Sequence, residues 1–249
     1  MRDRDSHAYD ADFMDLAKHS SVRSARRIIE VVRSAFDVQS VLDVGCAVAS
    51  TLRAWQESGV GDVHGIDGDY VDRARLEIAQ PSFTAADLSR PIDLGRTFDL
   101  VESFEVAEHI PTSASETFVD TITRHSKGLV LFSAAPPGQG GEFHVNEQPY
   151  EFWRRLFAAR GFEAFDYVRP AIKDDKLVSY WYRYNIILYM HRDRISFAPE
   201  RVRRTQVQTV RDISPAVFQL RKAVVRSLPA SVQDGLSRIK SRVFRTGRF

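Results

Sequence analysis

Short apolar segments alternate with amphipathic segments along most of this chain, and this alternation limits the folds open to it. The apolar segments have the length and composition of buried strands: residues 40–44, 62–67, 98–102 and 128–132, with a weaker one at 83–86. Apolar residues at helical spacing predict helices over residues 14–36, 50–58, 69–79 and 147–160. This order of strands and helices predicts a mostly parallel sheet with helices on both faces.

Two further apolar segments, residues 162–168 and 180–189, follow each other late in the chain and predict an antiparallel hairpin at the edge of the sheet. The expected fold is therefore α/β, with a seven-stranded, mostly parallel sheet. We expect an N-terminal helical cap (1–36), a central domain (37–191) and a tail (192–249). Ligands of such sheets bind beyond the carboxyl ends of the strands, so the residues that follow each strand are the candidate site.

The net charge of +2 conceals a strongly basic tail. Residues 192–249 contain 14 Lys/Arg and 4 Asp/Glu, whereas residues 1–191 contain 21 and 29. Two amphipathic helices are predicted in the tail, one starting at Ser214 with Val217, Leu220, Val224 and Leu228 on one face, the other carrying Val232, Leu236, Ile239 and Val243. Residues 214–249 are therefore expected to contact an anionic membrane or another polyanion. A solvated basic helix face is the alternative.

Cysteine usage and hydropathy bear on the cellular compartment. The single cysteine, Cys46, excludes an intramolecular disulfide and favours a reducing compartment. No apolar run approaches the roughly 20 residues of a membrane span. We expect a cytoplasmic protein, either free or peripheral at the inner membrane face.

The segment after the first predicted strand carries a ligand-binding pattern. Asp43 and Gly45 are followed by Ala47 and Ala49. The match to the dinucleotide pattern G-x-G-x-x-G is poor. The segment resembles instead the first motif, D-x-G-x-G-x-G, of class I S-adenosylmethionine (SAM)-dependent methyltransferases, with alanines at two positions where glycine is usual. The resemblance covers about residues 38–190, and implies a Rossmann-like fold and SAM as the cofactor.

The same resemblance assigns roles to the residues that follow the next strands. It implies cofactor contacts from Asp43, Gly45 and Ala47, from Asp67 and Gly68 to the ribose hydroxyls, from Asp87 and Leu88 to the adenine, and from Ser103 and Phe104 to the methionine part. Each aspartate, taken alone, also suits a helix cap or a turn.

A cluster of ionisable residues follows the fourth strand. Glu105, Glu108 and His109 form an E-x-x-E-H motif, and His144 comes after the fifth strand, behind a Gly- and Pro-rich loop (135–141) that can act as a lid. Two carboxylates with imidazole suit Mg²⁺ or Mn²⁺. The motif resembles the metal site of ubiquinone-pathway O-methyltransferases and of small-RNA 3′-terminal 2′-O-methyltransferases, which implies Glu105, Glu108, His109 and His144 as ligands. Alternatives are a structural Glu–His pair, or His109 or His144 acting directly as the general base.

The acceptor is constrained by the chemistry and by a further resemblance. A hydroxyl needs its proton withdrawn before it attacks a sulfonium methyl, and a metal or histidine can do this. Residues 144–149 and the aromatic helix after them resemble bacterial methyltransferases of saccharide and glycolipid assembly. A sugar hydroxyl is therefore expected. Alternatives are a catechol or quinone precursor, an RNA 3′-terminal 2′-hydroxyl, disfavoured because the tail has few aromatics for base stacking, or a non-catalytic SAM-fold accessory protein.

Overall fold

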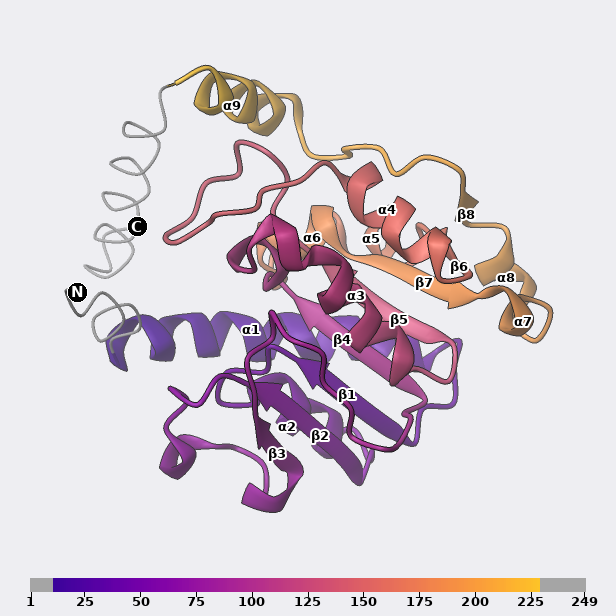
Figure 1. The fold of residues 1–249 in the computed structure, drawn as a ribbon. Helices are drawn as coiled ribbons and strands as arrows, with labels where there is room; N and C mark the ends of the chain where they lie inside the picture. The colour runs from indigo at the N-terminus through magenta and orange to yellow at the C-terminus, as the bar shows by residue number, and fades with distance from the viewer. Residues whose placement is uncertain (1–10, 229–249) are drawn as a thin grey trace.

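The computed structural model has a twisted β-sheet flanked by α-helices (Figure 1). It describes the backbone of residues 11–228 and the side chains from residue 22 onward. The sheet has eight strands in the order β3-β2-β1-β4-β5-β7-β6-β8. Strands β1 to β5 run parallel, and β7, β6 and β8 add to the β5 edge in antiparallel fashion. The strands are β1 (Ser40–Val44), β2 (Asp62–Asp67), β3 (Phe83–Ala85), β4 (Leu100–Phe104), β5 (Leu129–Ser133), β6 (Phe162–Phe165), β7 (Ile187–His191) and β8 (Gln206–Val207).

This strand order places the candidate site. The chain runs outward from β1 to β2 and β3, then crosses back to β4 on the other side of β1, so strand order reverses between β1 and β4. The segments that follow these two strands therefore meet at one edge, where α/β sheets bind ligands. The mostly parallel sheet with a late antiparallel hairpin is confirmed, with eight strands in place of seven.

Two apolar cores pack against opposite faces of the sheet. Residues of α1, α2, α5 and α6 form one core with the sheet, and residues of α3 and α4 form the other. The largest fully buried side chains include Trp55 of α2 and Trp153 of α4. The α-helices are α1 (Ala11–Arg33), α2 (Ser50–Glu57), α3 (Ser115–Arg124), α4 (Tyr150–Ala159), α5 (Val168–Ile172), α6 (Tyr180–Asn185), α7 (Arg192–Ile195), α8 (Glu200–Arg203) and α9 (Ala216–Ser227).

Four short 3₁₀ turns complete the described elements: η1 (Arg73–Arg75), η2 (Gln80–Ser82), η3 (Ala107–His109) and η4 (Thr112–Ala114). The helix predicted over residues 69–79 is wrong, because η1 is the only helical turn there. The Asp72 side chain caps this turn by accepting from the Ala74 N–H. The Glu77 N–H then donates to the Val48 carbonyl at 3.0 Å, so the segment bonds to the loop after β1 and forms no continuous helix.

The second late strand, predicted over residues 180–189, is also partly wrong. Residues 180–185 form α6, and only Ile187–His191 form a strand. The Tyr- and Trp-rich segment has high β-propensity, but propensity is overridden when tertiary packing favours another conformation. Here Tyr182 and Tyr184 are buried by a helix that crosses the end of β5.

Sequence reasoning also missed α3, which Phe118, Val119 and Ile122 anchor in the second core. The first tail helix is found as α9, whereas the second, with Val232 to Val243, lies outside the described residues. The first part of the tail belongs to the sheet, since β8 pairs with β6. No helix within residues 11–228 is long and apolar enough to cross a membrane.

Candidate active site

The loop after β1 is held tightly at the reversal point of the sheet. Gly45 has a φ of 93°, and a Cβ on it would lie 2.3 Å from the Val106 Cγ2. Only glycine satisfies both conditions without strain. The N–H groups of Gly45 and Cys46 donate to the Ile66 carbonyl at 2.8 and 3.2 Å, which ties the loop to the end of β2.

The two alanines of this loop keep the backbone conformation that glycine would favour. Ala47 and Ala49 have φ angles of 49° and 65°, in the left-handed region. This conformation costs an L-residue about 1 kcal/mol. The loop therefore retains its turn despite the substituted glycines, at a small cost in free energy of folding.

Asp67, at the end of β2, is the residue around which this loop is organised. Its Oδ2 accepts from the Ala47 N–H at 2.6 Å, and its Oδ1 accepts from the Gly68 N–H at 2.7 Å and from the Tyr70 hydroxyl at 2.5 Å. Burial raises the pKa of Asp67 by more than these three donors lower it, so its pKa lies above the usual value. The structure thus brings together Ala47, Asp67 and Gly68, three of the predicted cofactor residues.

Asp43 lies deeper, within β1, beside a second buried acid. It is directly opposite Glu102 of β4 in the sheet. Burial and the charge of Asp67 raise the pKa of Asp43 to about 8, and burial and Asp43 raise that of Glu102 well above its usual value. The Trp55 indole donates to Glu102 at 2.9 Å. Glu102 is an unpredicted member of this acidic group.

The remaining predicted cofactor residues have varied surroundings. Asp87 makes a turn, accepting from the Ser89 N–H at 2.9 Å and from the Ser89 hydroxyl at 2.6 Å, while Leu88 is buried. The buried Ser103 hydroxyl donates to the Val44 carbonyl at 2.7 Å, so it holds β4 to β1. Phe104 packs edge-on against Tyr182.

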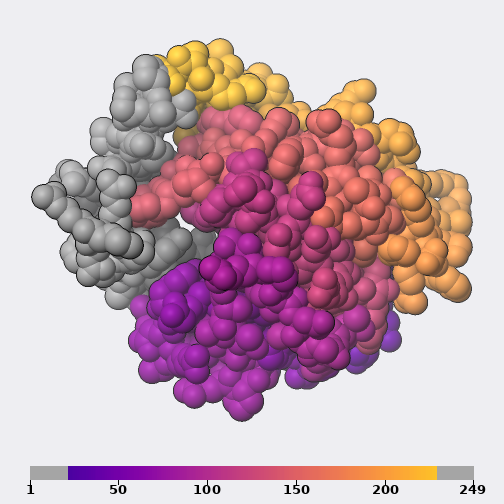
Figure 2. All heavy atoms as spheres, viewed as in Figure 1, coloured from indigo at the N-terminus to yellow at the C-terminus, as the bar shows by residue number. Residues whose placement is uncertain are grey.

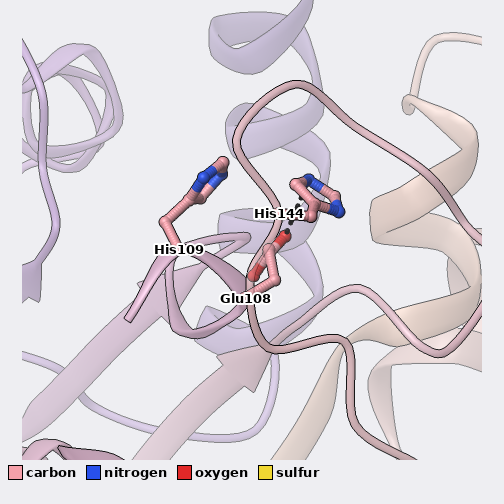
Figure 3. Close-up of side chains that lie close together, drawn as sticks. All are labelled: Glu108, His109 and His144. Atoms are coloured by element: carbon pink, nitrogen blue, oxygen red, sulfur yellow. Dashed lines mark ion pairs between the residues drawn. The ribbon is translucent and has the colours of Figure 1, made fainter. Parts of the chain in front are cut away.

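Three of the four predicted metal ligands converge on one point. Glu108, His109 and His144 each present a ligand atom, and these atoms all lie within 4.8 Å of one another. Figure 3 shows Glu108 and His109 on one turn, which follows β4, and His144 facing them from the loop after β5. The His144 Nε2 lies 4.0 Å from the Glu108 Oε1, and the two imidazole rings meet edge to face at 4.9 Å.

Glu108 is the most unusual member of this cluster. Its side chain is 1% exposed, and neither carboxylate oxygen has a side-chain hydrogen-bond partner. Burial, and next the charge of Glu105, raise its pKa well above the usual value, although the backbone N–H groups of Glu108 and Ala135 lower it. Burial and the nearby His144 lower the pKa of His109 to about 4, which leaves its imidazole neutral and able to bind a cation. A buried acid without side-chain hydrogen-bond partners beside two imidazoles fits a divalent metal ion.

Glu105, the fourth predicted ligand, lies apart from this cluster. Its backbone is left-handed, with a φ of 56°. The carboxylate accepts from the Gln139 amide at 2.8 Å and from the Asn185 amide at 3.1 Å. Glu105 thus holds the lid loop to α6 and supplies negative charge near Glu108.

Glu147 orients His144 and shapes the lid. Its Oε1 lies 2.7 Å from the His144 Nδ1 and accepts from the Gly140 N–H, and its Oε2 accepts from the Gly138 N–H, also at 2.7 Å. A carboxylate at Nδ1 leaves Nε2 as the nitrogen with the free lone pair, which points toward Glu108. In the sequence, the one signal for this role of Glu147 was its position three residues after His144.

Three comparisons place the chain among known proteins. Residues 16–167 match the model of a family described as methyltransferase domain. Solved structures with similar folds include DesVI of Streptomyces venezuelae (15% identity, 74% of this chain and all of that chain, TM-score 0.57) and the sugar N-methyltransferase KedS8 of Streptoalloteichus sp. (18%, 77% and 96%, TM-score 0.55).

A third is magnesium protoporphyrin IX methyltransferase of Synechocystis with bound SAM (18%, 70% and 80%, TM-score 0.52). No curated protein sequence matches this chain. The family model covers more than half of the 249 residues. The chain belongs to the methyltransferase domain family and has the fold of SAM-dependent methyltransferases.

Proposed function

We propose that this protein is a SAM-dependent O-methyltransferase that uses a divalent metal ion and methylates a sugar hydroxyl. The observation that carries the proposal is the Glu108 carboxylate, which has no side-chain hydrogen-bond partner and is buried beside His109 and His144. Methyl transfer to an amine needs no such group, because a neutral amine is already a good nucleophile. A hydroxyl needs its pKa lowered, which a bound metal ion does.

The donor set favours one metal over another. One carboxylate with two imidazoles suits Mn²⁺ better than Mg²⁺, since Mg²⁺ prefers oxygen ligands. Glu108, His109 and His144 would hold the ion, and a vicinal diol of the acceptor can supply further oxygen ligands. In the alternative mechanism without a metal ion, His144, oriented by Glu147, would act as the general base.

The cofactor would occupy the other half of the same edge. Asp67 has the acceptor oxygens that a ribose diol requires, and the Gly45–Ala49 loop brings backbone close to the ligand. The Tyr70 hydroxyl now donates to Asp67, so SAM would displace this bond when it binds. The acceptor class rests on the resemblance to saccharide methyltransferases, and a sugar N-methyltransferase is among the structural neighbours.

The experiment separates cofactor, metal and acceptor. SAM binding is measured by calorimetry and Mn²⁺ binding by electron paramagnetic resonance, on the wild type and on Glu108→Gln. We expect SAM binding in both proteins and Mn²⁺ binding in the wild type alone. Unchanged Mn²⁺ binding in Glu108→Gln would refute the metal site, and absent SAM binding would refute the enzyme.

Acceptor class is then tested with labelled SAM against sugars, amino sugars, catechols and RNA 3′ ends, with metal and after chelation. Metal-dependent labelling of a sugar hydroxyl supports the proposal. Labelling of an amino group that survives chelation would identify an N-methyltransferase instead. Labelling of RNA or of catechols alone would leave the metal chemistry intact and replace the acceptor.

A further inference from the structure

Helix α9 presents an apolar face to solvent. Its exposed large residues are Val217, Leu220 and Val224, with 69%, 65% and 52% of their surfaces exposed. The exposed Ala216 and Ala223 lie on the same face, because these positions recur at spacings of three and four residues. Figure 2 shows α9 at the outer surface of the molecule, at the top of the view. An apolar stripe of this kind indicates an interaction surface.

The opposite face of α9 contacts the rest of the protein, and these contacts hold the apolar stripe outward. Phe218 stacks on Tyr180 of α6 with ring centroids 5.3 Å apart. The Lys222 ammonium, 8% exposed, binds Asp212 at 2.5 Å. The Arg221 guanidinium donates to the Gln139 carbonyl at 3.2 Å, in the lid loop. The helix is thereby fixed in its rotation about its own axis.

The charge of the sequence from α9 onward favours one partner. From residue 213 to the C-terminus the sequence has eight Lys/Arg and one Asp, and within the described residues Arg226 of α9 is exposed. An apolar helix face in a basic stretch of sequence fits the interface of an anionic bilayer, where apolar side chains enter the acyl boundary and cations meet lipid headgroups. A nucleic acid would leave the stripe in water, and a second copy would bring like charges together.

We propose that the exposed face of α9 binds the surface of an anionic lipid bilayer. Helix α9 also contacts the lid loop, through Arg221 and Gln139, on the face opposite the apolar stripe. This proposal does not depend on the acceptor or on the metal. It depends on the geometry of α9 and on the charge of the chain that follows it.

The test is co-sedimentation of the full chain with vesicles. One set contains phosphatidylglycerol and phosphatidylcholine in equal parts, and the other contains phosphatidylcholine alone. The variant combines Val217→Gln, Leu220→Gln and Val224→Gln, and Phe197→Gln is the control because Phe197 is 79% exposed in the turn after α7. We expect binding to anionic vesicles only, about tenfold weaker in the triple variant and unchanged in the control.

Each other outcome overturns the proposal. Failure of the wild type to bind anionic vesicles, equal binding to neutral vesicles, or equal binding by the triple variant would do so. A change from dimer to monomer in the triple variant, seen by light scattering, would assign the face to a second copy. We expect the triple variant to fold, because its three substitutions lie at exposed positions. SAM binding and thermal unfolding verify this.

Discussion

Replacing Glu147 by glutamine tests whether this carboxylate orients His144 and the lid. The carboxylate receives three contacts at 2.7 Å, from the N–H groups of Gly138 and Gly140 and from the His144 ring. Glutamine retains one acceptor oxygen, so at least one donor loses its partner. The other contacts change from charge-assisted to neutral hydrogen bonds, which are about half as strong.

The size of the effect follows from these contacts. One lost hydrogen bond to a charged group costs roughly 1.5–3 kcal/mol. The weakening of the other two brings the total loss of free energy that stabilises the loop and His144 to about 2–4 kcal/mol. Part of this loss weakens the preference of the His144 ring for its present orientation. We therefore expect the affinity for Mn²⁺ to fall about 10- to 100-fold, the usual effect of removing a partner of a ligating histidine.

The assay has two independent readouts. Mn²⁺ titration followed by electron paramagnetic resonance reports the metal affinity, and nitrogen-15 spectra of the histidine rings report the tautomer of His144 without metal. Glu163→Gln is the matched control, because Glu163 also accepts a hydrogen bond, from Arg192 at 2.8 Å, but on β6. A folded Glu147→Gln protein with wild-type Mn²⁺ affinity and an unchanged His144 spectrum would refute the reasoning.

Three more outcomes are expected. Gly45→Ala should lower the free energy of unfolding, measured by urea titration, by more than about 2 kcal/mol, because the new Cβ overlaps Val106 at a left-handed position. Gly61 has open space around it, so the control Gly61→Ala should change the free energy of unfolding by under about 1 kcal/mol. Burial raises the pKa of Glu102 above its usual 4.5, so the stability that protonated Glu102 contributes is lost as the pH rises above 4.5. The wild type should therefore lose stability relative to Glu102→Gln over that range, and parallel pH profiles would contradict this. A chain ending at His191 should unfold at a lower temperature than a chain ending at residue 212. The shorter chain lacks β8 and the Arg211 carbonyl that accepts from the buried Arg169. Equal melting temperatures would show that residues 192–212 are dispensable for stability.

The sequence by itself determined the parallel part of the sheet. Residues 40–44 and 62–67 are strands with the predicted bounds, because each is a short segment with β-branched or aliphatic residues, bounded by small or acidic residues, and lies between segments of helical or turn pattern. Parallel strands end at the same edge, so the order of Asp67, Asp87 and the residues after β4 was sufficient to place the candidate site.

Only the tertiary structure decided which of these side chains meet. Glu105 and Glu108 are equivalent in the motif, yet the left-handed backbone at Glu105 directs it to Gln139 and Asn185, which are 34 and 80 residues away in sequence. Contacts over such separations depend on how the lid and α6 pack, and no local pattern encodes them. For the same reason the aromatic segment 180–185 is a helix, since the burial available beside β5 outweighed its β-propensity.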